Sequence, residues 1–397
     1  MTNIRDYIKR KEKKQEDSFG KKILRHRLTI LYRTVLVIAV IAAAAVVVVV
    51  QMKNRIFSQF QTISSVPRES IADSTTVALG DNILVYSSDG ASCFDRKGEA
   101  LWNQTFEMQA PMLDICQNVA AIGDYNGRSV FLMNTERALG EIDTKMPIRS
   151  FAVSANGIVA AVLDDTADTT WIYLFNASGD TLAYFKTTMK DSGYPISVAI
   201  SDNGYLVSVS YLYMDNGTMR SSVAFYNFGP VGQNEIDNFV SSYDYIDTVV
   251  PFVKFLNNAK AVAVADNRLV FYEGEQKPVS IADVLLDGQI KGVYYGNGYV
   301  ALIYNDVTGN ALYKADIYND MGKLADTVLL DIQFTDLLFH KDKLIAYNEQ
   351  ECLVHTIGGM DNFSGNFNKQ VLTLIPSKAS YEYIAVTPDS IDTIELK

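Results

Sequence analysis

Cysteine and histidine, the residue types most often used for catalysis and metal binding, are scarce in this chain. The three cysteines, Cys93, Cys116 and Cys352, are never adjacent. Beyond the first 50 residues the only histidines are His340 and His355, and zinc usually takes three or four nitrogen or sulfur ligands. We therefore predict no metal centre on these residues and three buried thiols. A disulfide between Cys93 and Cys116 stays open, because it requires Cα atoms within about 7 Å.

Aspartates are numerous in the expected loops, so paired acids are easy to find. The loop candidates are Asp164, Asp165, Asp168, Asp215, Asp244 and Asp247. A glycoside hydrolase would need two carboxylates about 5–9.5 Å apart across a cleft. The same loops could offer oxygen ligands to calcium, but no segment has the ligand spacing of an EF-hand loop. Since no Gly-x-Ser-x-Gly turn occurs either, we predict no catalytic residues and no cofactor, with calcium as the open alternative.

Paired tyrosines are the best candidates for binding a ligand. The pairs are Tyr211 with Tyr213, Tyr243 with Tyr245, and Tyr294 with Tyr295. Exposed tyrosines offer a large contact area at low entropic cost, which suits a peptide or a sugar. The Tyr243-Asp244-Tyr245 sequence also lies in 227–251, the longest segment between repeats. The predicted ligand-binding residues are therefore Tyr243, Asp244, Tyr245, Tyr211 and Tyr213. The alternative is ordinary strand tyrosine packed between neighbouring units.

Charge is divided unevenly along the 397 residues, whose net charge is −11. Residues 1–27 carry ten bases and four acids, a net +6, whereas residues 51–397 carry −18. We exclude nucleic acid as a general partner, because duplex binding depends on neutralising phosphates. The basic segment has two interpretations. It is either a topology determinant that touches anionic lipid, or a binding site for nucleic acid or a cytosolic protein.

An apolar segment at residues 28–50 separates these two parts and has no polar side chain from Val35 to Val50. As a helix it would be about 34 Å long, and a bilayer's hydrocarbon core is about 30 Å thick. We predict a transmembrane helix over 28–52 and a cytoplasmic tail over 1–27, because basic flanks stay inside. The remainder would be extracytoplasmic. The alternatives are a cleaved signal peptide and a buried helix of a soluble protein.

From residue 71 onward, short β-branched runs alternate with Gly, Asn and Asp turns. Seven such runs begin near residues 82, 118, 157, 204, 259, 298 and 342, a mean spacing of about 43 residues. Four strands in a repeat of this length are typical of a β-propeller blade. We therefore predict an all-β domain over 71–397, a seven-bladed or alternatively eight-bladed β-propeller. A pair of sandwiches and an open solenoid are the other architectures considered.

The sequence also predicts the geometry of the turns and the way in which the ends of the β domain meet. An aromatic-Asx-x-x-Gly turn recurs at 94–98, 175–179 and 318–322, where the Asx side chain would bond the backbone and glycine would supply a positive φ. We expect residues 381–396 to complete a ring begun near residue 75. Residues 53–70 would then be a stalk, either a short helix ending near Pro67 or an irregular linker.

The segment ILVYSSDGASCFDRKGEALW, residues 83–102, resembles the repeats of quinoprotein-like (PQQ-like) and WD40-like propellers. The likeness rests on its Asp-Gly turn, on the Asp95–Gly98 turn and on Trp102, and no other unit carries that tryptophan. The enzymatic quinoproteins bind pyrroloquinoline quinone and calcium beside adjacent cysteines, which this chain lacks. The layout of the whole chain is similar to that of uncharacterised bacterial single-pass membrane proteins with an extracytoplasmic propeller. That resemblance implies a location in the cell envelope.

These observations lead us to expect a non-enzymatic binding or scaffold module anchored in the cell membrane. Its partner would be an envelope protein, a peptide or a glycan. One alternative is an envelope glycan hydrolase or lyase that uses carboxylates converging in a deep central pocket. The second alternative is a sensor that passes an external signal through the helix to the basic tail.

Overall fold

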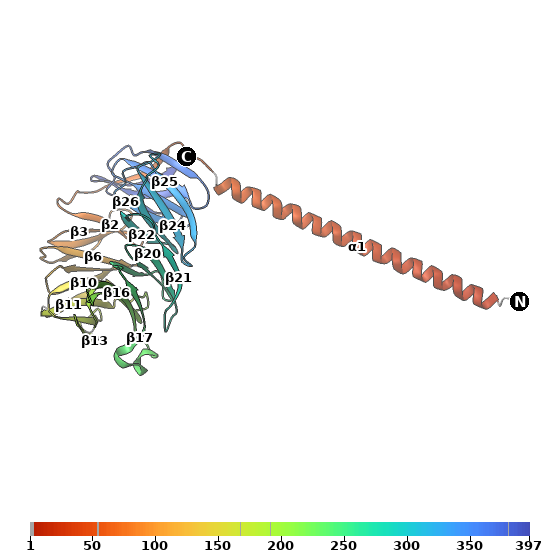
Figure 1. Ribbon diagram of the computed structural model, residues 1–397. Helices are drawn as coiled ribbons and strands as arrows, with labels where there is room; N and C mark the ends of the chain where they lie inside the picture. The colour runs from red at the N-terminus through yellow and green to blue at the C-terminus, as the bar shows by residue number, and fades with distance from the viewer. Residues whose placement is uncertain (1–3, 54, 167, 191, 380) are drawn as a thin grey trace. The chain divides into compact units, whose positions relative to one another are not determined.

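A computed structural model describes residues 4–53, 55–166, 168–190, 192–379 and 381–397 (Figure 1). The chain divides into two compact units, Met1–Arg55 and Ile56–Lys397. The first unit contains helix α1 (Ile4–Lys53). Within α1, Leu24–Gln51 is long and apolar enough to cross a membrane, the one such stretch in the described residues. This stretch overlaps the predicted span 28–52, and its insertion into a membrane stays a prediction.

The described part of the second unit folds into eight antiparallel sheets of four strands each, the blades of a propeller. Blade 1 contains β2 (Thr75–Leu79), β3 (Asn82–Tyr86), β4 (Gly90–Phe94) and β5 (Ala100–Thr105). Blade 2 contains β6 (Pro111–Cys116), β7 (Val119–Asp124), β8 (Ser129–Asn134) and β9 (Ala138–Asp143). Blade 3 contains β10 (Ile148–Val153), β11 (Val159–Thr166), β12 (Thr169–Phe175) and β13 (Thr181–Thr188). Blade 4 contains β14 (Tyr194–Ile200), β15 (Leu206–Asp215), β16 (Thr218–Asn227) and β17 (Phe239–Ile246).

The remaining blades follow the same pattern, except that the last one takes a strand from the start of the unit. Blade 5 contains β18 (Phe252–Phe255), β19 (Lys260–Val264), β20 (Arg268–Glu273) and β21 (Val279–Leu285). Blade 6 contains β22 (Gly292–Gly296), β23 (Tyr299–Asn305), β24 (Tyr313–Asn319) and β25 (Leu324–Leu330). Blade 7 contains β26 (Asp336–His340), β27 (Lys343–Tyr347), β28 (Glu351–Thr356) and β29 (Asp361–Asn366). Blade 8 contains β30 (Thr373–Pro376), β31 (Glu382–Val386), β32 (Ser390–Leu396) and β1 (Phe60–Pro67).

Alternation of side chains along the strands explains why the blades stack. In β11, Val159 and Ala161 pack toward blade 2, whereas Ala160 and Val162 pack toward blade 4. Because successive strand residues point to opposite faces, a strand with apolar residues at every position must be covered on both sides. The described residues form one buried apolar cluster at each of the eight junctions between neighbouring blades, including the junction of blade 8 with blade 1. The ring is therefore closed.

The structure of residues 53–70 differs from the expectation, and this segment helps to close the ring. Instead of a helical stalk or an irregular linker, this segment contains β1, which pairs antiparallel with β32 from Phe60↔Leu396 to Pro67↔Ser390. The predicted non-covalent pairing of the chain ends is confirmed, but the N-terminal partner starts at residue 60 and not near 75. The propeller has eight blades, the alternative given beside seven. A count of seven blades leaves out blade 8. That blade has four strands only when β1 is included, and the pairing of β1 with the distant β32 is not visible in the sequence.

The recurring turn has the predicted geometry. The Asp95 side-chain Oδ1 accepts hydrogen bonds from the backbone N–H groups of Lys97 and Glu99, both at 2.8 Å, and Gly98 has a φ of +78°. The 176–179 and 319–322 turns repeat this arrangement with asparagine. Trp102 ties blade 1 to blade 2, because its indole Nε1 donates to the backbone oxygen of Asn134 at 2.8 Å.

Candidate functional site

Blade 4 carries a row of polar side chains whose alignment follows from strand register. Tyr211 in β15 lies opposite Ser222 in β16, which lies opposite Asp244 in β17. The next row on the same face holds Tyr213 opposite Arg220. Residues directly opposite each other in antiparallel strands have Cβ atoms about 4.5–5.5 Å apart, so these side chains form one continuous surface.

This surface is one wall of a cavity of about 440 Å³. The other wall is the connection from β13 of blade 3 to β14 of blade 4, which contributes Lys190, Ser192 and Gly193. Gly193 has a φ of +86°, and a Cβ at this position would lie 2.8 Å from the backbone oxygen of Leu212. Glycine therefore lets the connection approach β15 closely, which narrows the cavity. Its volume lies in the range of about 300–1,000 Å³ that is usual for small-ligand sites.

Two carboxylates, the ammonium group of Lys190 and one ion pair give the cavity its chemistry. The carboxylates of Asp215 and Asp244 both line it, and Asp215 pairs with Arg220 at 3.2 Å. Partial burial and the nearby charge of Asp244 raise the pKa of Tyr213, so its hydroxyl stays protonated as a donor. Exposed carboxylates accept hydrogen bonds from hydroxyl and ammonium groups. The cavity is therefore suited to a ligand that presents such donors.

Tyr211 is the most buried of the three aligned residues on this wall and is only 2% exposed. Its hydroxyl lies 2.9 Å from that of Tyr226, which also lines the cavity, and burial raises the pKa of both residues. The ring of Tyr226 stacks on Phe185 of blade 3 with the ring centroids 4.3 Å apart. These contacts pack Tyr211 and Tyr226 between blades 3 and 4.

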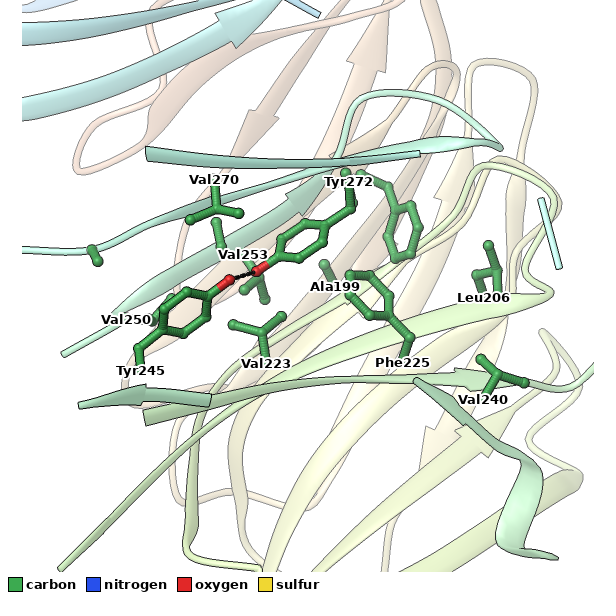
Figure 2. Close-up of a cluster of buried hydrophobic side chains, with 14 residues drawn as sticks. Ala199, Leu206, Val223, Phe225, Val240, Tyr245, Val250, Val253, Val270 and Tyr272 are labelled. Atoms are coloured by element: carbon green, nitrogen blue, oxygen red, sulfur yellow. Dashed lines mark hydrogen bonds between the residues drawn. The ribbon is translucent and has the colours of Figure 1, made fainter. Parts of the chain in front are cut away.

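Tyr243 and Tyr245 lie on the opposite face of β17 from Asp244, because side chains alternate along a strand. Tyr245 is 8% exposed, and its hydroxyl is 2.5 Å from that of Tyr272. Figure 2 shows these two hydroxyl groups facing each other in the core between blades 4 and 5. Tyr243 packs against the same core and donates to the backbone oxygen of Pro278 at 3.1 Å. Three of the five predicted binding residues therefore meet at the cavity, and these two tyrosines pack between blades.

The Tyr294–Tyr295 pair also separates. Tyr294 packs edge-on against Phe334 in the junction of blades 6 and 7. Tyr295 lines a smaller cavity of about 170 Å³ in the middle of the ring, beside Lys254 and Asp202. In this cavity the carboxylate of Asp202 accepts hydrogen bonds from the side chains of Cys116 and Gln117. The Asp202 carboxylate is therefore held by two side chains that follow or end the first strand of blade 2.

The three cysteines do not pair with one another, and His355 pairs with two carboxylates. All three cysteines are free thiols, which answers the question of a Cys93–Cys116 disulfide, and burial raises the pKa of Cys93 to about 11 and of Cys352 to about 12. His355 lies between Asp326 and Asp361, at 2.9 and 2.7 Å. Within the described ranges, no three histidine, cysteine or acidic side chains gather as a metal site.

Sequence reasoning missed the serines of the cavity, Ser222 and Ser242. A usable signal was present for Ser222, because Asn216-Gly217 is a two-residue hairpin turn with φ values of +50° and +82°. Counting outward from this turn places Tyr211 opposite Ser222. No comparable signal exists for β17, because 11 residues separate it from β16 and a bulge interrupts their pairing.

Solved propeller structures share this fold at low sequence identity. Sqt1 of Saccharomyces cerevisiae matches with a TM-score of 0.51 and 11% identity over 86% of this chain and 98% of that protein. Apo AztD of Citrobacter koseri matches with a TM-score of 0.51 and 8% identity, over 75% and 87% of the two chains. BamB of Moraxella catarrhalis gives a TM-score of 0.49 and 12% identity, over 85% and 100%. At these identities the matches show the fold alone.

Comparison with sequences gives two results. No curated protein matches the chain significantly. Residues 53–396 match a protein family described as a family of unknown function, DUF5711. This match includes β1 and all the strands that follow it and leaves the apolar stretch of α1 outside. The chain therefore belongs to the DUF5711 family.

Proposed function

We propose that this protein is a membrane-anchored, non-enzymatic binding module that presents the blade 4 cavity outside the cytoplasm. The observation that carries the proposal is the register of β15, β16 and β17, which places Tyr211, Ser222 and Asp244 side by side on one wall of the cavity. The fold by itself defines no function, because propellers host many activities. The proposal therefore rests on the chemistry of this site.

The anchor and the orientation rest on the N-terminal sequence. The apolar stretch Leu24–Gln51 follows a segment with a net charge of +6. Basic residues next to a membrane span remain on the cytoplasmic side, so the propeller would be extracytoplasmic. Ligands in that compartment with many hydroxyl or ammonium groups include envelope glycans and lysine-containing peptides. Both chemistries suit a cavity with two carboxylates and several hydroxyl groups.

Photo-crosslinking in intact cells tests this proposal directly. A photoreactive phenylalanine replaces Ser242, which is exposed and lines the cavity, and a second version carries it at Leu324 on blade 6, which is 56% exposed. We expect a discrete adduct from position 242 that disappears when Asp244→Asn is added. Tyr243→Phe is the matched control, because it removes a hydroxyl from the other face of the same strand. Equal adducts from positions 242 and 324, or an adduct that persists with Asp244→Asn, would contradict the proposal.

Cleavage of an envelope glycan, by hydrolysis or by elimination, is the second candidate function. Asp215 and Asp244 line one cavity, and glycosidases use paired carboxylates. Incubating the full-length protein with isolated cell-wall polymer distinguishes the two candidates. Release of new reducing ends or unsaturated sugars, lost with Asp244→Asn, would favour an enzyme. Binding of the polymer without its cleavage would favour the binding module.

A further inference from the structure

A second cavity, of about 360 Å³, lies where the ring closes. Its apolar lining comes from both sides of the closure: Ile83 and Phe94 belong to blade 1, and Ile391 belongs to blade 8. The covalent link from β1 to β2 crosses the cavity and adds Ile71, which is 43% exposed. Ile83 and Ile391 are 1% and 3% exposed and belong to the apolar cluster of this junction. The cavity is therefore an opening in the core between blades 8 and 1.

One cation lies in this apolar lining. Arg68 follows directly after β1, and its backbone N–H donates to the backbone oxygen of Asp389 at 2.9 Å, which fixes the chain at that point. The Nη1 atom of its guanidinium group is buried and has no hydrogen-bond partner among the described residues. Arg68 as a whole is half-buried, and this partial burial lowers its pKa. A buried N–H donor without an acceptor is unfavourable, so this position favours a ligand that supplies one.

Glu69 is the other charged residue of the lining, and it is exposed at the surface. Its carboxylate does not satisfy Nη1 of Arg68, and its negative charge opposes the binding of an anion. The site therefore combines the buried N–H donor of Arg68, an apolar lining and the opposing negative charge of Glu69 at its edge. Guanidinium groups bind carboxylates with paired, charge-assisted hydrogen bonds, which outweigh a neighbouring exposed charge that water screens.

We propose that this cavity binds a small monocarboxylic acid with an apolar body, whose carboxylate pairs with Arg68 and whose hydrocarbon part lies against Ile83, Phe94 and Ile391. The volume is near the lower end for small-ligand sites, which favours a compact acid over a folded macromolecule. A bound acid would touch both blade 8 and blade 1. Binding would therefore also stabilise the closed ring, because it favours the folded state in which the cavity exists.

The test compares an acid with its alcohol on the full-length protein in detergent. The probes are phenylbutanoate and phenylbutanol, which share an apolar body and differ in the carboxylate, and binding is measured by isothermal titration calorimetry. We expect the acid to bind at least about tenfold more tightly than the alcohol and to raise the thermal unfolding midpoint. If both probes bind with the same affinity, or if neither shows saturable binding, the proposal is wrong.

Two charge variants locate the interaction. Arg68→Met keeps the aliphatic length and the backbone bond to Asp389, and we expect it to remove the preference for the acid while the alcohol still binds. Binding of the alcohol shows that the cavity persists in this variant. Glu69→Gln is the matched control in the same lining, and we expect it to bind the acid as tightly as the wild type or more tightly. The assignment would be overturned if Arg68→Met still preferred the acid. It would also be overturned if Glu69→Gln lost tenfold in affinity for the acid, which is about 1.4 kcal/mol.

Discussion

Asp114 in β6 and Lys254 in β18 form an ion pair of 2.8 Å, although they belong to blades 2 and 5, which are not neighbours. The first strand of each blade lines the middle of the ring, so this pair crosses the central space. Asp114 also accepts a hydrogen bond from the backbone N–H of Val153 in blade 3 at 2.8 Å. Lys254 lies 5.5 Å from the centre of the Tyr295 ring in blade 6. One ion pair therefore connects four blades across the centre.

Breaking this ion pair should destabilise the ring. The two side chains are only 16% and 19% exposed, so Lys254→Met leaves a buried carboxylate without a cation, at a cost of about 3 kcal/mol in the free energy of unfolding. Burial alone would lower the pKa of Lys254, but Asp114 and Tyr295 outweigh it and raise the pKa. Asp114→Asn with Lys254→Met should lose less than the sum of the single losses, as measured by chemical denaturation. Additive losses would show that the two groups do not interact.

The stability of the junction between blades 6 and 7 should depend on pH through His355. Burial disfavours the charged imidazole, but the carboxylates of Asp361 and Asp326 outweigh burial and raise its pKa above the ordinary 6.5. The folded state then binds the proton more tightly than the unfolded state. This contribution is therefore complete below about pH 6.5 and is lost as the pH rises through the raised folded value.

Thermal unfolding of wild type and His355→Gln from about pH 5.5 to about pH 8.5 measures this effect. We expect the wild type to lose more stability than the variant as the pH rises. His340→Gln is a suitable control, because burial lowers the pKa of His340 and gives a contribution of opposite sign. Parallel pH profiles for wild type and His355→Gln would rule out this role.

The segment before β1 should be essential for closing the ring. Phe57 is 4% exposed and packs in the junction of blades 7 and 8, with its ring centroid 4.4 Å from that of Tyr381. Phe57→Ala should lower the free energy of unfolding by about 3–5 kcal/mol, because it leaves a cavity in this core. Ile63→Ala in β1 is the control, since Ile63 is 53% exposed, and we expect a loss of at most about 0.5 kcal/mol. Equal losses in urea unfolding would argue against a specific role for Phe57.

Membrane insertion of the apolar stretch should fail when charge enters its middle. Val40→Asp and Ala43→Asp each place a carboxylate near the centre of Leu24–Gln51, at a cost of about 2.5–3.5 kcal/mol. We expect the double variant to leave the carbonate-resistant membrane fraction, whereas Gln51→Asp at the end of the stretch stays in it. Retention of the double variant in that fraction would contradict the membrane anchor.

Orientation has a separate test. Lys323 lies in the exposed turn between β24 and β25, so Lys323→Cys should react with a membrane-impermeant maleimide in intact cells if the propeller is extracytoplasmic. The unsubstituted chain measures the background from its own three thiols. Labelling that requires permeabilised cells would reverse the proposed topology.

Local features of the chain were predictable from its residues. The apolar stretch, the strand period and the turns at Asp95, Asn176 and Asn319 each depend on a few neighbouring residues, and the structure contains them. Turn geometry needs only an Asx side chain and a glycine with positive φ, so the sequence carries the whole signal. The propeller architecture was predictable for the same reason, since each repeat restates the pattern.

The amino-acid sequence by itself determined the repeating unit, whereas tertiary structure decided how many units close the ring and which side chains face a cavity. Blade 8 needs β1 and β32, which are more than 300 residues apart, and no local pattern indicates that pairing. Asp244 reaches the cavity while Tyr243 and Tyr245 enter the core, because a shift of one residue in register exchanges the two faces of a strand. Tyr243 and Tyr245 pack against blade 5, and that apolar surface exists only in the folded ring.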